Sequence, residues 1–348
     1  MSGSNRSSAA GFEVTVGGKT YKQAADPGTK GVQRLTIEDH VDMVDMLTLR
    51  MGGTEGQATW DWSIGDDVTA KIGEGSKELF KGQIVAIEPS YQVEGISQCN
   101  IRCLDPMHKL GRGRMTRFFE DKKDSDVVSK VAAAAGVPVG TCEASEETHP
   151  YILQRNESNV AFLKRLAARN NYLLRMEDGS LVFKKAQFSG SVFTLEMGDN
   201  LRSLRLSFNT VDQVQKVVVR GWDIMTKEPI VGEADSGKVD KIGTGELGCD
   251  MASQFGDSTA YVTDVPVFSQ GAANLIAKVE MNRLARQFAR GSATIQGDDS
   301  VRAGNMISIA GLQTGVNGDY YVLASRHIIS NRTGYSTEFT FCGTSYGA

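Results

Sequence analysis

Residues 151–185, YILQRNESNVAFLKRLAARNNYLLRMEDGSLVFKK, contain the clearest succession of secondary-structure signals in this chain. Between residues 158 and 169, apolar side chains recur three and four positions apart, which predicts an amphipathic helix. Asn170-Asn171 can end this helix, because asparagine tolerates the left-handed backbone of a C-terminal cap. YLLRM and LVFKK then flank the turn residues 177–180 and predict a hairpin. A helix followed by a hairpin indicates a small α+β domain.

A second helix, which precedes the quoted stretch, extends this α+β domain to residues 105–190. Asp124 or Ser125 can cap the start of that helix, valines follow on one side, and Gly136 can end it. Before it, residues 109–123 are rich in Lys and Arg and include Phe118 and Phe119. Such a run can contact phosphates. We favour a solvated or subunit-facing linker, because acidic residues follow at once.

Residues 11–104 predict a β-barrel, after a flexible arm at residues 1–10. Seven candidate strands alternate apolar and polar side chains, and polar or glycine-rich turns separate them. FEVTV and KTYK flank Gly17-Gly18, which is the signal of a two-residue hairpin turn. A glycine-rich loop is expected at residues 52–56. Strands at this spacing favour a closed or nearly closed sheet.

The chain returns to β structure after the α+β domain. Residues 191–222 and 286–348 predict a second barrel, and residues 223–285 predict a polar, acidic insertion with a helix at about 271–290 that Gly291 ends. Residues 306–324 repeat the rhythm of residues 68–87, which suggests two related barrels. The predicted fold class is therefore α+β, mainly β, with two barrels, one α+β domain between them and one insertion.

The composition fits a turn-rich protein of two or three domains. The chain has 348 residues, with 38 Gly against 7 Pro, and a net charge of −4 argues against a dedicated nucleic-acid binder. No apolar run is long enough for a membrane helix, and the polar N-terminus lacks the core of a signal peptide. We therefore expect a chain that is made in the cytosol and stays soluble, without membrane insertion.

No constellation of residues predicts an enzyme, and we assign no catalytic, metal or cofactor-binding residue. The five cysteines lack zinc-site spacing and are expected to be buried free thiols. The four histidines form no metal-binding motif, and His327 lies in an apolar strand as a packed residue would. Phosphate loops and nucleophile elbows are also missing from the sequence.

The quoted stretch also resembles the signature of a known family, the phage late control protein D and VgrG baseplate hubs. The residues that match are Arg155, Glu157, Ser158, Phe162, Leu163, Arg165, Leu166, Tyr172 and Gly179. Flanking segments agree in the same order, at residues 45–49, 79–84, 117–122 and 318–335. The resemblance covers roughly residues 10–343, and its strength lies in the collinear order of motifs that are individually loose.

The resemblance implies a structural hub of a contractile tail or a phage-like injection system. Members of this family are homotrimers in which each chain carries two barrels similar to the tube subunit. Such a trimer adapts a hexameric inner tube, or a tube-initiator protein, to a threefold spike. Other baseplate proteins are expected partners, and DNA or protein cargo passes through the lumen. Because the chain ends at Ala348 without the repeats of a VgrG spike, we expect the trimeric spike to be a separate chain. This favours a phage, a tailocin or a phage-like injection system over type VI secretion.

Exposed loops at barrel ends are candidates for contacts with neighbours. The candidate interaction residues are Gly52, Gly53, Glu55, Arg112, Arg114 and Trp222. Two other functions stay open, a tail-associated cell-wall hydrolase and a nucleic-acid-contacting tail module. The first needs a paired Glu/Asp cleft or a zinc triad, and the second needs the basic residues near Arg112.

Overall fold

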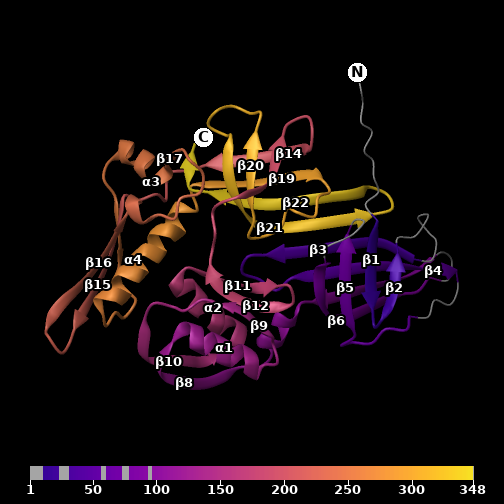
Figure 1. Ribbon diagram of the computed structural model, residues 1–348, viewed down its shortest axis with the longest axis horizontal. Coiled ribbons are helices and arrows are strands. Elements are labelled where there is room, and N and C mark those ends of the chain that lie inside the picture. The colour runs from indigo at the N-terminus through magenta and orange to yellow at the C-terminus, as the bar shows by residue number, and fades with distance from the viewer. Residues whose placement is uncertain (1–10, 23–30, 56–59, 73–77, 93–95, 348) are drawn as a thin grey trace.

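The computed structural model describes residues 11–22, 31–55, 60–72, 78–92 and 96–347, and it is mainly β (Figure 1). The largest sheet has 13 strands. These strands are β1 (Phe12–Val16), β2 (Lys19–Lys22), β3 (Gly31–His40), β4 (Met46–Glu55), β5 (Asp67–Ile72), β6 (Glu78–Ser90), β7 (Ile96–Leu104), β13 (Ser191–Glu196), β14 (Leu201–Phe208), β19 (Ala289–Gln296), β20 (Met306–Ala310), β21 (Gly318–Ser330) and β22 (Gly334–Gly343).

One pairing joins the first hundred residues to the last thirty. The main path of the sheet runs β14-β19-β22-β21-β3-β4-β7-β6-β5-β1-β2, so β3 and β21 lie side by side as antiparallel neighbours. We call this pairing the seam. On either side of the seam the sheet is curved (Figure 1), and each side has its own cluster of buried apolar side chains. Leu35, Ile37 and Ile101 are buried on one side, and Phe288 and Phe341 are buried on the other.

The middle of the chain forms a separate α+β region. Its elements are η1 (Pro106–Gly111), β8 (Met115–Lys123), α1 (Asp124–Ala134), β9 (Val139–Cys142), β10 (Thr148–Glu157), α2 (Asn159–Asn170), β11 (Tyr172–Glu177) and β12 (Ser180–Lys185). Ser158 caps α2 by accepting the N–H of Ala161 at 3.3 Å, and Asn171 ends it with φ at 55°. The predicted helix and hairpin are thus confirmed. The N-cap position of α1 is Lys123, not Asp124 or Ser125, and its side chain makes no capping hydrogen bond.

A third region consists of a three-stranded sheet covered by a long helix. It contains β15 (Lys216–Asp223), β16 (Glu228–Asp235), β18 (Thr259–Val262) and α4 (Gln270–Ala285). Smaller elements beside it are η2 (Ser236–Lys238), β17 (Glu246–Leu247), α3 (Gly248–Met251), η3 (Ala252–Phe255) and β23 (Ser345–Tyr346). Gly232 allows α4 to approach β16, because a Cβ at this position would lie 2.3 Å from the backbone of Ala273.

The placement of residues 214–222 differs from the expectation. β15 pairs with β16 and β18, and not with the 13-stranded sheet. The expected boundary at residue 222 therefore falls inside the β15–β16 hairpin, and the polar segment 223–268 contains the strands β16, β17 and β18. Val217 and Val219 are buried beneath α4, and contact with that helix accounts for their apolar character.

Two further expectations are wrong at element boundaries. The helix expected to end at Gly291 ends at Ala285, and Gly291 lies in β19, where a Cβ would lie 2.3 Å from the ring of Phe341. The loop expected at residues 52–56 is strand up to Glu55, which pairs with Ile96, and residue 56 lies outside the described residues. By contrast, the Gly17-Gly18 hairpin is confirmed, with positive φ at both glycines.

No helix in the part of the chain that the structure describes is both long enough and apolar enough to cross a membrane.

Candidate functional site

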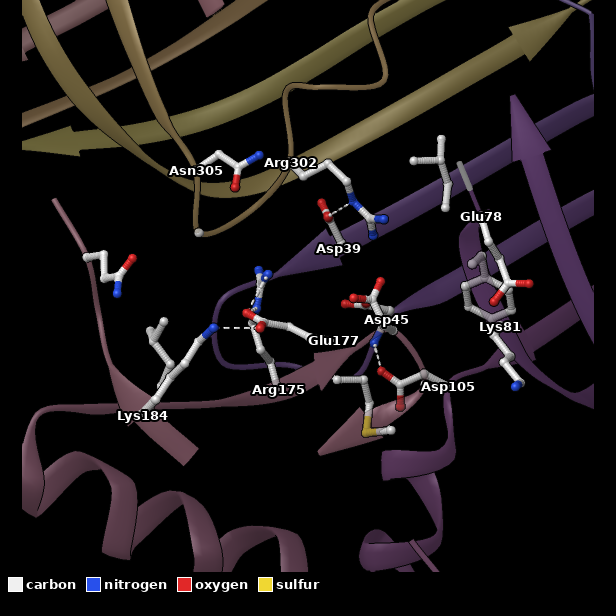
Figure 2. A pocket seen from close by; sticks show the side chains of 18 of the residues that line it. Asp39, Asp45, Glu78, Lys81, Asp105, Arg175, Glu177, Lys184, Arg302 and Asn305 are labelled. Atoms are coloured by element: carbon white, nitrogen blue, oxygen red, sulfur yellow. Dashed lines mark hydrogen bonds and ion pairs between the residues drawn. The ribbon is translucent and has the colours of Figure 1, made fainter. Parts of the chain in front are cut away.

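A charged pocket lies where the seam meets the middle region. Its cavity volume is about 340 Å³, and it is lined by β3, β6, the β11–β12 hairpin and the loop at residues 297–305 (Figure 2). The polar residues drawn there are Asp39, Asp45, Glu78, Lys81, Asp105, Arg175, Glu177, Lys184, Arg302 and Asn305. Because these residues come from all parts of the chain except the α4 region, the pocket is a junction of separate regions.

Asp39 is a buried carboxylate of this pocket. Its side chain is 3% exposed, and Arg302 Nε donates to Asp39 Oδ2 at 2.8 Å. The backbone N–H and the hydroxyl of Ser325 and the N–H of Ala303 also donate to Asp39 Oδ1. Burial alone would raise the pKa of Asp39, but Arg302 and these donors lower it below its ordinary value. Asp39 is therefore ionised and couples β3 to β21 and to the loop before β20.

Asp45 and Asp105 differ from Asp39, because their pKa values are raised and not lowered. Asp105 Oδ2 accepts the N–H of Asp45 at 2.8 Å, and Asp105 Oδ1 accepts the N–H of Met107 at 2.7 Å. Burial raises the pKa of Asp105 to about 6, despite these two donors. Burial, together with the nearby charges of Asp39 and Asp105, raises the pKa of Asp45 well above its ordinary value. Among these three aspartates, Asp39 is therefore a stable carboxylate, whereas Asp45 and Asp105 resist ionisation.

The β11–β12 hairpin reaches the same pocket through an ion-pair chain. Arg175 donates to Glu177 at 3.0 Å and to the carbonyl of Ala303, and Lys184 Nζ lies 2.6 Å from Glu177 Oε2. Burial alone would raise the pKa of Glu177, but Lys184 and Arg175 hold it below the ordinary value. Figure 2 shows these side chains facing Arg302 and Asp39 across the pocket, so the middle region is tied to the loop before β20.

His327 extends the polar network along the seam. Its Nε2 lies 3.1 Å from Ser325 Oγ, and its Nδ1 lies 3.0 Å from the hydroxyl of Tyr335 and 3.2 Å from Thr337 Oγ1. Burial lowers the pKa of His327 to about 4, so the ring is neutral at pH 7. The prediction of a packed histidine is confirmed, because every ring nitrogen has a partner inside the protein.

The pocket connects regions of the chain, and several of its charges are paired with one another. Asp39 is matched to Arg302, and Glu177 is matched to Arg175 and Lys184. Among the residues that the structure describes, no three His, Cys, Asp or Glu side chains are placed to hold a metal ion. The described cysteines are free, as expected, and burial raises the pKa of Cys103 to about 12, so this thiol does not supply a thiolate at pH 7.

The structure places the predicted interaction residues on three separate elements. Gly52, Gly53 and Glu55 lie in β4, and Gly52 is buried. Arg112 and Arg114 lie exposed between η1 and β8, where Arg114 donates to the carbonyl of Asn156 at 3.3 Å. Trp222 lies in β15 and is 55% exposed. These residues are not brought together, and their contact roles stay predictions.

Sequence reasoning missed the junction pocket. Asp39 and Arg302 are 263 positions apart, so no local spacing could reveal their pairing. One weak signal is that Asp39 follows Leu35 and Ile37 on the inward-facing side of an alternating strand, where a buried charge needs a partner.

Comparison with known proteins gives one family match. The family described as the Alg8 N-terminal domain matches residues 12–331. A search of curated proteins gives no match.

Solved structures with similar folds come from phage tails and a related secretion system. The 43 kDa tail protein of prophage MuSo2 from Shewanella oneidensis superposes with a TM-score of 0.73 at 16% identity, covering 95% of this chain and 97% of that one. A tail protein from Neisseria meningitidis MC58 gives 0.67 at 15% identity, with 95% and 96% covered. An E. coli component of the type VI secretion system, itself similar to T4 bacteriophage tail proteins, gives 0.64 at 11% identity, with 96% and 78% covered. At these identities the likeness is one of fold.

Proposed function

The chain belongs to the Alg8 N-terminal domain family, and from this premise and the tail-protein fold we propose that it is the structural baseplate hub of a contractile tail or phage-like injection system. In this proposal the protein is a homotrimer that adapts a sixfold inner tube to a threefold spike. It assembles in the bacterial cytoplasm and becomes part of the tail baseplate. It is a structural protein and not an enzyme.

The seam is the observation that carries this proposal. One chain contains two curled halves of a sheet, each with its own apolar interior, and the β3–β21 pairing holds them together. If each half acts as one tube-like barrel, three chains present six similar barrels to a sixfold tube while keeping threefold symmetry elsewhere. This supports the symmetry-adaptor role.

We propose a domain division that follows the sheets. Residues 11–104 form the first barrel, residues 105–190 the middle domain, and residues 191–209 with 286–348 the second barrel. The expected insertion then begins before β15 and ends with α4, because β15 belongs to the sheet under that helix. The junction pocket keeps the two barrels and the middle domain in one arrangement, so that the hub moves as a unit when the tail contracts.

The proposed partners are the hexameric tube or its initiator, the trimeric spike and other baseplate proteins. DNA or protein cargo passes through the lumen, which we expect to be neutral or acidic. On the exposed side of the seam, Arg326 pairs with Glu38 at 2.8 Å and with Glu338 at 3.6 Å. Pairing with two carboxylates weakens the capacity of Arg326 to retain a phosphate backbone, which supports this expectation at that position.

The test is a nucleation assay with the tube subunit of the same particle. The hub should shorten the lag of tube assembly at substoichiometric amounts and should sit at one end of each tube in negative-stain images. Tubes that form at the same rate without end-bound protein would contradict the proposal. Salt-dependent DNA retention that disappears on Arg112→Ala with Arg114→Ala would instead favour the nucleic-acid-contacting alternative.

A further inference from the structure

The β15–β16 hairpin ends in an exposed apolar tip, which we call the arm. Trp222, Ile224 and Met225 are 55%, 74% and 91% exposed, and Figure 1 shows the hairpin projecting at the lower left. The turn is well defined, because Asp223 accepts the N–H of Met225 at 2.8 Å and the N–H of Thr226 at 3.2 Å. A fixed turn carrying Trp, Ile and Met is typical of the anchors that dominate protein interfaces.

The two-stranded β8–β10 sheet carries a second apolar surface, which we call the ribbon face. Phe118 and Tyr151 are 56% and 53% exposed, and their rings stack with centroids 5.5 Å apart. Leu153 lies directly opposite Phe118 in the register and is also exposed. The alternate residues Phe119 and Ile152 point inward to the core of the middle region. The outward aromatic pair is therefore ordered without being needed for that core.

The two surfaces lie in segments of opposite charge. Residues 223–268, which include the tip of the arm, contain nine Asp or Glu and only three Lys. Residues 109–123, which include Phe118, contain six Lys or Arg and two acidic residues. Arg112 and Arg114 are exposed beside the ribbon. The opposite net charge of these two segments favours contact between them and disfavours contact of like with like.

The arm and the ribbon face also have a fixed relative position. Asn171 of the middle region donates to Asp240 at 3.0 Å, and Gly271 at the start of α4 lies against Glu147. Figure 1 shows the β15–β16 hairpin at the lower left and the β8–β10 sheet at the bottom of the same half of the molecule. In a closed threefold ring, the directions from one subunit to its two neighbours differ by about 60°, whereas in a straight filament the two neighbours lie on opposite sides. The placement on one side suits a small closed ring.

We propose that the partner of these surfaces is a second copy of this chain, with the arm of each copy docked on the ribbon face of the next. This inference rests on the proposed homotrimer and adds the contact that closes it. The contact is heterologous, so each copy uses both surfaces, and three contacts complete the ring. The apolar tip supplies burial, and the opposite charges set which surfaces pair.

Removing the anchors tests the contact. The arm variant Ile224→Ser with Met225→Ser and the ribbon variant Phe118→Ser should each raise the dissociation constant of the trimer by roughly a hundredfold, measured by mass photometry and sedimentation. Phe255→Ser is the matched control, because Phe255 is 83% exposed in the same region as the arm but lies outside it. Circular dichroism confirms that each variant is folded.

Charge exchange separates a direct contact from a structural defect. Arg112→Glu with Arg114→Glu should weaken the trimer, and so should Glu228→Lys with Asp264→Lys. Combining all four changes in one chain should restore the trimer, because arm and ribbon then attract again with the signs exchanged. Failure of the combined variant to recover would overturn the assigned pairing of surfaces.

The outcomes distinguish this inference from the proposed function. If the wild type and all variants form equally stable trimers, the arm–ribbon contact is wrong while the homotrimeric hub stands. If the wild type stays monomeric at every concentration measured, both the contact and the homotrimer are overturned. Loss of the trimer in the arm and ribbon variants alone supports the contact.

Discussion

Arg302→Ala is expected to destabilise the protein strongly at pH 7. The substitution removes the guanidinium that lies 2.8 Å from Asp39 and leaves a carboxylate whose side chain is only 3% exposed. Removing one partner of a buried ion pair costs about 3–5 kcal/mol. Because Ser325 and Ala303 still donate to Asp39, we expect the lower end of this range, about 3 kcal/mol.

Arg326→Ala is the control at the same seam. Arg326 pairs with Glu38 and Glu338, but the side chains of these three residues are between 35% and 46% exposed. An exposed pair of this kind contributes at most about 1 kcal/mol. Comparing the two variants therefore separates loss of a buried charge partner from loss of any arginine at the seam.

Urea unfolding followed by tryptophan fluorescence measures both variants. The rings of Trp60 and Trp62 stack with centroids 5.5 Å apart, and both pack against the core formed by the first hundred residues, so their fluorescence reports on that part of the sheet. Since the folded-state pKa of Asp39 is lowered, its stabilising contribution is present above the unfolded pKa near 4 and is lost as the pH falls through the folded value. The difference between wild type and Arg302→Ala should therefore shrink in acid. Equal free energies of unfolding for Arg302→Ala and Arg326→Ala at pH 7 would refute the structural role of the junction.

Three further perturbations test other parts of the structure. Burial raises the folded-state pKa of Asp105 to about 6, so the stability that this residue contributes is fully present below pH 4 and is lost as the pH rises. In urea titrations, the free energy of unfolding of the wild type should fall by about 3 kcal/mol relative to that of Asp105→Asn between pH 4 and 7. Gly232→Ala should lower stability by about 2–3 kcal/mol in thermal unfolding, because its Cβ meets the backbone of α4, whereas Gly11→Ala, with open space around it, should be neutral. Phe162→Ala should cost about 3–5 kcal/mol in urea, and Phe118→Ala, at an exposed position, should cost less than about 1 kcal/mol.

Local signals predicted the local elements correctly. The Gly17-Gly18 turn needs positive φ at both positions, and the helix after Ser158 has a serine cap and an apolar stripe. In both cases neighbouring residues determine the conformation, so the sequence pattern carries the information.

Features that depend on distant contacts could not be predicted in this way. The run at residues 216–223 is a strand as expected, but its sheet is decided by pairing with β16 and β18 and by cover from α4. The sequence predicts that Gly291 ends a helix, whereas in the structure the missing side chain leaves space for the ring of Phe341. The charged pair Asp39 and Arg302 exists only because folding brings β3 beside the loop that precedes β20.

The central claim is that this chain is a homotrimeric hub, and one combined measurement tests it most directly. The mass of the purified protein in solution should be three times the 37.6 kDa of the chain, and negative-stain images should show a ring with a pseudo-sixfold outline. A compact monomer with an open cleft in the same images would contradict the claim.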